Sequence, residues 1–283
     1  MPLVTSKQLL LNAQQGSYAV GAFNVENMEM VQAVVAAAEE LNAPVILQTT
    51  PGTLKYADVD FFFANVKTAA QKAHVPVALH LDHGNSFALA IKALRAGYTS
   101  IMIDGSKLPF EENIALSRKV AEACHAAGIP VEAELGKVGG KEDDLVVTGE
   151  SPYTDPQEAS EFVAQTGVDF LAVGIGTAHG FYKGEPCVDL ERLSDIHAVV
   201  DIPLVLHGTS GVPDETVAEA VLQGICKVNY ATELRVAFSK GVKDVLSKNP
   251  ETYDPKKYNQ AGRELVKELV KKRIRNLGSV GKA

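Results

Sequence analysis

The stretch Pro76-Val-Ala-Leu-His-Leu-Asp-His83 contains the pattern that recurs along this chain. A proline precedes a short apolar run, the run ends in polar residues, and a longer segment with helical periodicity, Phe87–Ala96, follows. Proline interrupts a helix and favours extended backbone just before it. Apolar runs of about four to eight residues between such signals are typical of buried strands. The stretch therefore predicts one strand followed by one helix.

The same unit is repeated from the N-terminal region to the C-terminal tail. The predicted strands are Ala19–Phe23, Val45–Gln48, Val77–Asp82, Ser100–Asp104, Val131–Leu135, Phe170–Gly174, Leu204–His207 and Lys227–Asn229. The predicted helices are Met28–Leu41, Asp60–Ala73, Phe87–Ala96, Glu112–Ala126, Pro156–Gln165, Leu190–Val200, Asp214–Leu222 and, in the tail, Arg263–Asn276.

Eight alternating strand and helix units predict an α/β fold of the TIM (β/α)8 barrel type. A doubly wound sheet would normally carry a glycine fingerprint after its first strand. Here that strand ends in Gly21-Ala-Phe-Asn24, so the fingerprint is absent. We expect a single barrel domain over residues 1–283, with a lid-like loop at 136–155 and a helical tail at about 233–277.

The amino-acid composition limits which kinds of molecule the protein is expected to bind. Of 283 residues, 46% are hydrophobic, and 27 Lys and Arg stand against 35 Asp and Glu, for a net charge of −8. An acidic surface disfavours nucleic-acid and membrane partners but allows a small anionic substrate. Three scattered cysteines favour a reducing compartment. Neither a signal peptide nor an apolar run of about 18 residues is apparent, so the sequence predicts a soluble cytoplasmic protein.

The segment 136–155 is long for a loop within a barrel. It contains Gly139-Gly140 and an acidic run that begins at Glu142. A loop of this length is more often a lid than filler. A mobile acidic surface loop is the alternative interpretation.

Polar residues gather where the predicted strands end. In a TIM barrel these ends and the loops after them form the active-site face, and unpaired polar groups are costly to bury there. The residues in question are Asn24, Asp82, His83, Asp104, Glu132, Glu134, His179, His207 and Asn229.

Three histidines follow the third, sixth and seventh predicted strands: His83, His179 and His207. If they converge, they form a three-imidazole site with an open coordination position, which suits catalytic zinc. Imidazole also binds other divalent transition metals. Any one of these histidines alone is more often a hydrogen-bonded structural residue. We expect His80 to support the site and the remaining histidines to lie on the surface: His74, His125 and His197.

Asp82 is the best acid/base candidate because it would point into the barrel mouth beside His83. Orienting a ligand histidine is its alternative role. Asp104, Glu132 and Glu134 fit either a similar role or a second metal position, and spacing alone does not separate these options.

Small residues follow the last two strands, where this fold often binds phosphate. Gly208-Thr-Ser-Gly211 allows close approach of backbone N–H groups to an anion. Asn229-Tyr-Ala-Thr232 leads into a helix N-terminus, and Gly180 adds another close approach. A plain tight turn explains each cluster alone, whereas together, beside a metal, they indicate a phosphorylated substrate.

In their order along the chain, six segments resemble class II ketose-1,6-bisphosphate aldolases, and the resemblance extends from Ala19 to the final Gly278-Ser-Val-Gly-Lys-Ala283. The segments are His80-Leu-Asp-His-Gly84, Val131-Glu-Ala-Glu-Leu-Gly136, Gly139-Gly-Lys-Glu-Asp143, Gly176-Thr-Ala-His-Gly180, Leu206-His-Gly-Thr-Ser-Gly211 and Asn229-Tyr-Ala-Thr-Glu233.

The resemblance implies zinc-dependent retro-aldol cleavage of a ketohexose bisphosphate to dihydroxyacetone phosphate and glyceraldehyde 3-phosphate. By motif, the zinc ligands are His83, His179 and His207, and Asp82 handles the proton of the C4 oxygen. Further roles implied by motif are a second or displaced metal position at Asp104 and Glu134, proton transfer at the enediolate carbon by Glu142, and binding of dihydroxyacetone phosphate by Gly180, Gly208, Thr209, Ser210, Asn229, Tyr230, Ala231 and Thr232. A monovalent cation, Na+ or K+, near the phosphate is usual in the family.

Within the family, the segments around His179 and Asn229 resemble the tagatose-bisphosphate branch. Ala231 departs from many fructose-bisphosphate members, which place an acid or amide there. The opening Met1-Pro-Leu-Val4 and the segment Tyr182–Pro186 resemble the fructose branch instead. We expect tagatose bisphosphate as substrate, with fructose bisphosphate as the alternative.

Other functions remain open from the sequence. A Schiff-base aldolase needs a lysine inside the barrel, and Lys227 is the only candidate. A metallohydrolase could use the same three histidines to activate water. A non-catalytic companion subunit would be expected to lack the ligands. The family is commonly dimeric or tetrameric, so we expect a homo-oligomer.

Overall fold

The computed structural model describes residues 3–142, 145–147, 153–182 and 184–283, with only the backbone at 141–142 and 145–147. In this part of the chain, eight parallel strands close into a barrel in the order β1-β11-β10-β8-β5-β4-β3-β2. The predicted TIM barrel is therefore confirmed. The barrel strands are β1 (Val20–Asn24), β2 (Val45–Thr49), β3 (Val77–Gly84), β4 (Ser100–Ile103), β5 (Val131–Leu135), β8 (Phe170–Val173), β10 (Leu204–Leu206) and β11 (Ile225–Tyr230).

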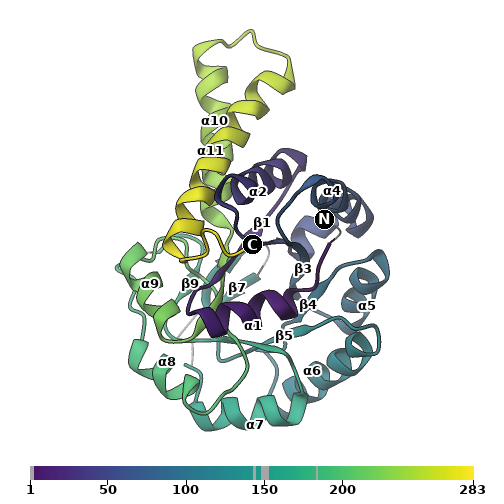
Figure 1. Cartoon of the computed structure of the whole chain (residues 1–283), viewed down its shortest axis with the longest axis vertical. Helices are drawn as coiled ribbons and strands as arrows, with labels where there is room; N and C mark the ends of the chain where they lie inside the picture. Colours follow the sequence, from purple (N-terminus) through teal and green to yellow (C-terminus); the bar gives the residue numbers. More distant parts are fainter. Residues whose placement is uncertain (1–2, 143–144, 148–152, 183) are drawn as a thin grey trace.

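Helices surround the barrel as an outer layer (Figure 1). They are α2 (Met28–Leu41), α3 (Pro51–Ala57), α4 (Val59–Lys72), α5 (Phe87–Ala96), α6 (Phe110–His125), α7 (Pro156–Thr166), α8 (Leu190–His197) and α9 (Asp214–Leu222). The local sequence determines where several helices begin. The N-cap side chains of α2, α5 and α7, which are Asn27, Ser86 and Asp155, each accept a hydrogen bond from a backbone N–H of the first helical turn.

A further helix, α1 (Ser6–Gly16), lies across one end of the barrel (Figure 1). The strand–helix pattern did not predict it. Its buried residues Leu9, Leu10 and Ala13 pack against interior residues of the barrel such as Val20 and Ile46. This apolar group fills the amino-terminal end of the barrel, so polar residues inside the barrel concentrate toward the opposite end.

Two irregularities in strand pairing change which side chains point inward. Between β3 and β4, Leu81 pairs with Ile101 and Gly84 with Ile103, so β3 contains one extra residue. His83 within this bulge has φ of 49°. Side chains alternate across a regular strand, and the bulge lets the neighbours Asp82 and His83 both face the barrel mouth.

The second irregularity lies in β11. Leu204 of β10 pairs with Ile225, but the next residue, Val205, pairs with Lys227. Cys226 is the extra residue, and Lys227 then shares its face with the inward-facing Val20 of β1. The bulge thus turns a lysine into the barrel interior.

The segment 136–155 contains short strands, which the description of it as a loop did not anticipate. β6 (Gly139–Glu142) pairs antiparallel with β7 (Leu145–Val147) and parallel with β9 (Ala178–His179). A Cβ on Gly140 would lie 2.1 Å from the carbonyl oxygen of His179, so only glycine permits this approach. The pairing anchors β6 beside a candidate metal ligand.

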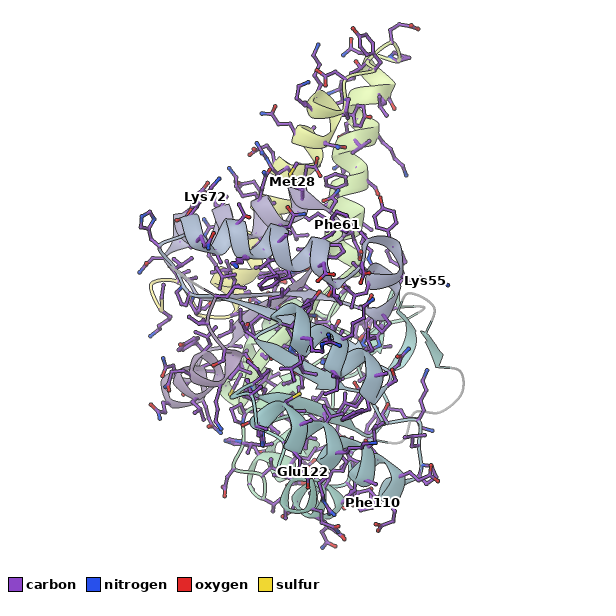
Figure 2. The ribbon with its side chains drawn as sticks, turned by 90° about the vertical axis from the view of Figure 1, so that its right-hand side faces the viewer. Met28, Lys55, Phe61, Lys72, Phe110 and Glu122 are labelled. Carbon is purple, nitrogen blue, oxygen red and sulfur yellow. The ribbon has the colours of Figure 1, made fainter. Side chains whose placement is uncertain are left out.

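The C-terminal tail forms two helices, α10 (Thr232–Lys248) and α11 (Pro255–Asn276), which project together beyond the barrel (Figures 1 and 2). The lower part of α11 packs against α2. Arg273 of α11 forms ion pairs with Asp214 and Glu233, which ties the tail to α9 and α10. Within the described ranges, no helix combines the length and apolar character needed to cross a membrane.

Candidate functional site

Three histidines from separate strands meet at the carboxyl end of the barrel. One nitrogen from each of His83, His179 and His207 lies within 4.8 Å of the others. The ring centroids of His83 and His207 are 4.8 Å apart, and those of His83 and His179 are 5.0 Å apart. His83 and His207 are buried, whereas His179 is partly exposed. The predicted convergence of the three imidazoles is therefore present in the fold.

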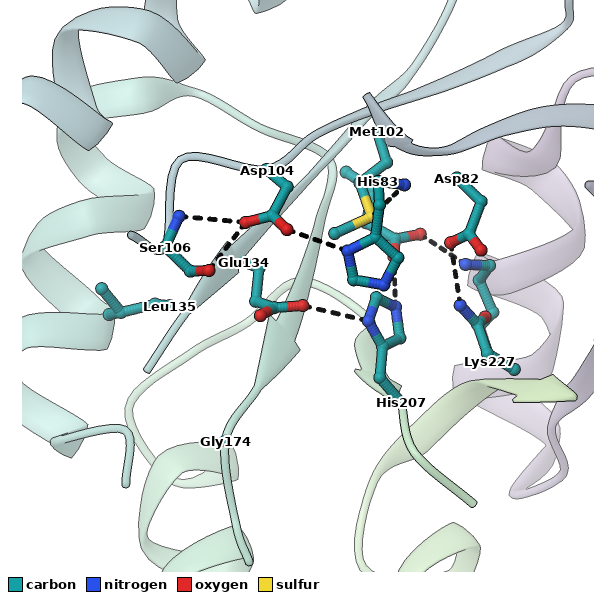
Figure 3. A network of polar contacts seen from close by, with 12 residues as sticks. Asp82, His83, Met102, Asp104, Ser106, Glu134, Leu135, Gly174, His207 and Lys227 are labelled. Atoms are coloured by element: carbon teal, nitrogen blue, oxygen red, sulfur yellow. Dashed lines mark hydrogen bonds and ion pairs between the residues drawn. The ribbon is translucent and has the colours of Figure 1, made fainter. Parts of the chain in front are cut away.

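Carboxylates orient two of these rings. Nδ1 of His83 lies 2.9 Å from Oδ2 of Asp104, and Nδ1 of His207 lies 3.0 Å from Oε2 of Glu134 (Figure 3). Asp104 in turn accepts hydrogen bonds from the backbone N–H and the hydroxyl of Ser106. His83, Asp104 and Glu134 form a second group whose donor atoms are close enough for a metal ion.

A second carboxylate holds the other face of His207. Nε2 of His207 lies 3.0 Å from Oε1 of Glu132, and Oε2 of Glu132 lies 2.8 Å from Nζ of Lys227. Burial alone would raise the pKa of Glu132, but the charge of Lys227 and the contact with His207 lower it far below its usual value. Burial alone would lower the pKa of His207, but its two carboxylate partners raise it to about 9. The carboxylates of Glu132 and Glu134 therefore favour the protonated form of the His207 ring between them.

His80 is fully buried and lies beside Glu132. Its Nδ1 is 2.7 Å from Oγ of Ser100, and its Nε2 is 3.6 Å from Oε2 of Glu132. Burial, followed by the charge of Lys227, holds the pKa of His80 well below its ordinary value. A neutral His80 fits the supporting position expected for it. Of the other histidines, His74 is exposed, and His125 at the end of α6 pairs with Asp169.

Asp82 is fully buried and is held at both carboxylate oxygens. Nδ2 of Asn24 donates to Oδ2 at 2.8 Å, and Nδ2 of Asn229 donates to Oδ1 at 3.0 Å. Gln48 donates to Oδ1 of Asn24 at 2.8 Å and fixes that amide. In Figure 3, Asp104 and Glu134 lie on one side of the His83 and His207 rings and Asp82 on the other. Two amide donors thus fix the orientation of the Asp82 carboxylate.

The glycine-rich turn after β10 packs directly on the strand that contains His179. Gly208 has φ of 66°, and a Cβ there would lie 2.7 Å from the backbone of Ala178. The hydroxyl of Tyr182 donates to the carbonyl of Gly208 at 2.7 Å and accepts from the N–H of Ala178 at 2.8 Å. Thr209 donates its hydroxyl proton to the carbonyl of Asn229. These contacts hold Gly208 and Thr209 of the predicted anion-binding turn, which follows His207 directly and continues to Ser210.

The last residues of β11 point in different directions, some toward the barrel mouth and some toward the surrounding helices. Asn229 faces inward to Asp82, whereas the ring of Tyr230 is buried outside the barrel, 5.6 Å from the ring of Phe23. Any contact of Tyr230 with a substrate would therefore come from its backbone. Ala231 immediately precedes α10, and no side chain caps this helix N-terminus. Such an N-terminus presents N–H groups to an anion.

Glu142 ends β6, two residues beyond Gly140, which pairs with His179. The side chain of Glu142 lies outside the described part of the structure. Its backbone position keeps the residue on the strand that borders the site.

Several residues of the site have no distinct signal in the sequence. Asn24 was visible at a strand end but received no role, and Gln48 and Ser100 gave no signal of their own. Lys227 was visible as a lysine within an apolar strand, but the bulge that turns it inward was not.

Two of the surface hollows in the described structure lie along the C-terminal helices. A hollow of about 600 Å³ along α10 includes Phe181, Thr232 and the cation Arg235. A hollow of about 780 Å³ lies at the α10–α11 turn and is lined by residues between Val245 and Lys257. The hollow at the α10–α11 turn shares no described residue with the histidine cluster.

A model of the class II fructose-bisphosphate aldolases matches residues 4–282. The chain belongs to this family. Its structure is similar to the YdjI aldolase from Escherichia coli K12, with 37% identity, 99% of each chain covered and a TM-score of 0.87. It is also similar to a putative fructose-1,6-bisphosphate aldolase from Coccidioides immitis, with 32% identity, 97% and 96% covered and a TM-score of 0.90.

A third structure, the fructose-bisphosphate aldolase of Campylobacter jejuni, shares the fold at 24% identity and a TM-score of 0.83, with 100% and 97% of the chains covered. Family membership identifies the chain as an aldolase, a carbon–carbon lyase. Class II aldolases act on phosphorylated ketoses and are generally zinc-dependent. The cluster of three imidazole nitrogens with adjacent carboxylates has the donor chemistry of a catalytic zinc site.

Proposed function

We propose that this class II aldolase reversibly cleaves D-tagatose 1,6-bisphosphate to dihydroxyacetone phosphate and D-glyceraldehyde 3-phosphate. The observation that supports the proposal most strongly is the meeting of His83, His179 and His207 at the mouth that Asp82 also faces. His83, His179 and His207 would hold Zn²⁺, with Asp104 and Glu134 as a second metal position. Zn²⁺ held there would supply a Lewis acid for the negative charge that develops on the substrate when C3–C4 breaks.

Asp82 moves the proton of the C4 hydroxyl in this proposal. Breaking C3–C4 turns the C4 hydroxyl into the aldehyde of glyceraldehyde 3-phosphate, so a base must take that proton. The amides of Asn24 and Asn229 hold the carboxylate at both oxygens, which limits its rotation between turnovers. Glu142, by its motif, would move the proton at the carbon that becomes C3 of dihydroxyacetone phosphate.

Backbone N–H groups would bind the phosphate of dihydroxyacetone phosphate. Gly180, Gly208, Thr209 and Ser210 lie on turns that contact each other through Tyr182, and Thr232 begins α10. Oriented N–H groups and a helix N-terminus offset phosphate charge without a basic surface, which fits the net charge of −8. A monovalent cation, Na+ or K+, beside the phosphate would complete this site.

Ala231 favours tagatose over fructose bisphosphate as the substrate. Its methyl group offers no hydrogen bond to a sugar hydroxyl, and it is mostly buried at the junction of β11 and α10. The two sugars differ only in C4 configuration. Fructose 1,6-bisphosphate is the second candidate, favoured by the name of the matching family and of the Coccidioides relative.

A parallel assay distinguishes these substrates. Initial rates of triose phosphate formation on tagatose and fructose 1,6-bisphosphates give kcat/KM for each sugar with the zinc-loaded enzyme. The proposal expects the higher value for tagatose. A higher value for fructose would transfer the assignment to that sugar, and cleavage of neither would reject both.

The setting proposed for this activity is the cytoplasm, with the chain as a homodimer or homotetramer. Cys124, Cys187 and Cys226 are free thiols, as a reducing compartment would keep them. The retained histidines argue against a purely non-catalytic companion role, although tagatose-type systems include such a subunit as a partner. Light scattering of the purified chain alone measures the oligomeric state, and it also shows whether the chain assembles without a companion subunit.

A further inference from the structure

A lysine is buried deep in the barrel where the proposed reaction has no direct use for it. The side chain of Lys227 is 1% exposed, and the carboxylate of Glu132 beside it is 0% exposed. Burying an ion pair costs several kcal/mol in desolvation, and apolar side chains of similar size would often be as stable. The β11 bulge turns this lysine inward, so the local backbone departs from regular pairing at the residue that introduces the charge.

Glu132 connects this ammonium to a candidate metal ligand. One oxygen, Oε2, lies 2.8 Å from Nζ of Lys227, and the other, Oε1, lies 3.0 Å from Nε2 of His207. The side chains of all three residues are at most 1% exposed. Oε2 also faces Nε2 of His80 at 3.6 Å. Without the ammonium, Oε2 would have only this longer contact, and the carboxylate would be free to rotate toward His80.

Each ring nitrogen of His207 contacts one carboxylate at 3.0 Å, Nε2 with Glu132 and Nδ1 with Glu134. A carboxylate at Nε2 keeps a proton on that nitrogen, and the lone pair for a metal is then on Nδ1. Nδ1 lies on the side of Glu134, which belongs to the group of potential ligands around His83. In His83, the carboxylate of Asp104 contacts Nδ1.

We propose that Lys227 is a positioning residue for the metal site: its ammonium holds Glu132 against Nε2 of His207 and so presents Nδ1 of His207 as the ligand nitrogen. This inference rests on the proposed metal site at the three histidines. It also gives the buried lysine a role other than Schiff-base formation, since an ammonium held by a carboxylate has no lone pair for attack on a carbonyl.

The test is zinc affinity, measured by competition with a chromophoric chelator on the chelator-stripped full chain. Partners that orient a metal ligand are worth about 10–100-fold in metal affinity. We expect Lys227→Met to weaken zinc binding by about tenfold or more. Arg273→Met is the matched control, because it removes another buried cation, one whose ion pairs are with Asp214 and Glu233 at the junction of α9, α10 and α11. Its zinc affinity should match that of wild type.

If Lys227→Met does not fold, zinc affinity is measured on the double variant Glu132→Gln/Lys227→Met instead. It removes both charges together, so no unpaired charge remains buried. We expect the same loss of about tenfold or more, and a loss below about threefold in whichever variant folds overturns the inference. Histidine ¹⁵N long-range correlation spectra give a second readout. Zinc-loaded wild type should show the His207 proton on Nε2, and the variants should lose that single pattern.

The controls separate this inference from the proposed function. If wild type itself binds no zinc, the metal site and the inference both fail. If wild type binds zinc and the Lys227 variants bind it equally well with an unchanged His207 signal, only the inference fails.

Discussion

Nδ2 of Asn229 donates a hydrogen bond to Oδ1 of Asp82 across 3.0 Å, although 147 positions separate the two residues in the chain. Asn24 donates to the second oxygen from the neighbouring strand. β1 lies beside β11 and β2 in the closed sheet, so barrel closure brings these amides to one carboxylate. The carboxylate of Asp82 on β3, the candidate proton-transfer group, is therefore held by side chains of β1 and β11.

Asp82→Ala should reduce kcat by about 10²–10⁴ while zinc remains bound, because the variant loses the proton-transfer group but none of the three histidines. Steady-state kinetics and metal content by atomic absorption measure the two effects separately. Full activity in this variant would refute the assignment of Asp82.

His207→Ala should remove metal binding and aldolase activity together. His207 is one of three imidazoles in the cluster and contacts both Glu132 and Glu134. Its loss leaves two histidines and an open cavity next to two carboxylates. Metal content and triose phosphate formation are measured on the same preparation, and retention of either at the wild-type level contradicts the assignment.

Gly140→Ala should lower activity by about tenfold or more, since strain of about 1–3 kcal/mol would fall on the β6–β9 pairing beside His179. The added Cβ would lie 2.1 Å from the carbonyl oxygen of His179, at a φ of +90°. Gly128→Ala is the control, because its φ is +72° but a Cβ there meets nothing within 4 Å. Equal activity of the two variants would show that the pairing of β6 with β9 is not needed for catalysis.

Asp169→Asn should destabilise the protein at pH 7 by about 1–3 kcal/mol, because a buried carboxylate loses charged partners. Burial alone would raise the pKa of Asp169, but hydrogen bonds from Lys7, the N–H of Val131 and His125 lower it overall. A folded pKa below the unfolded value, about 3.9, gives stability that is present above that pH and is lost as pH falls through the folded pKa.

The difference in unfolding free energy between Asp169→Asn and wild type should therefore shrink below about pH 4. Denaturant melts at several pH values measure it. Asp195→Asn on the exposed side of α8 is the control and should show no such trend. A difference for Asp169→Asn that grows as pH falls would reverse the sign that this carboxylate requires.

The barrel was predictable because each strand is a short apolar run between helical segments. Val131–Leu135 matched the predicted bounds, and the other strands differed by a few residues at their ends. α1 was missed because it packs on the end of the barrel and belongs to no strand–helix unit. The β6–β7 hairpin was missed because Gly139-Gly140 indicates a loop until its partner β9 is known.

The site was predictable where polar residues end regular strands, as at His207. The bulges in β3 and β11 limited what the sequence could predict about the site. Alternation along a regular strand cannot turn both Asp82 and His83 inward, and it gives no reason for Lys227 to point into the barrel. Pairing register depends on neighbouring strands that are distant in sequence, so the Glu132–Lys227 contact could only be found in three dimensions.

The most direct test of the metal-dependent aldolase site is product analysis with a ketose 1,6-bisphosphate and enzyme that has been stripped of metal and then reloaded with zinc. The stripped enzyme should be inactive. Zinc should restore the formation of dihydroxyacetone phosphate and glyceraldehyde 3-phosphate in equal amounts, and borohydride should trap no adduct on Lys227. Activity that survives stripping with a trapped Lys227 adduct, or release of inorganic phosphate in place of triose phosphates, would contradict the account.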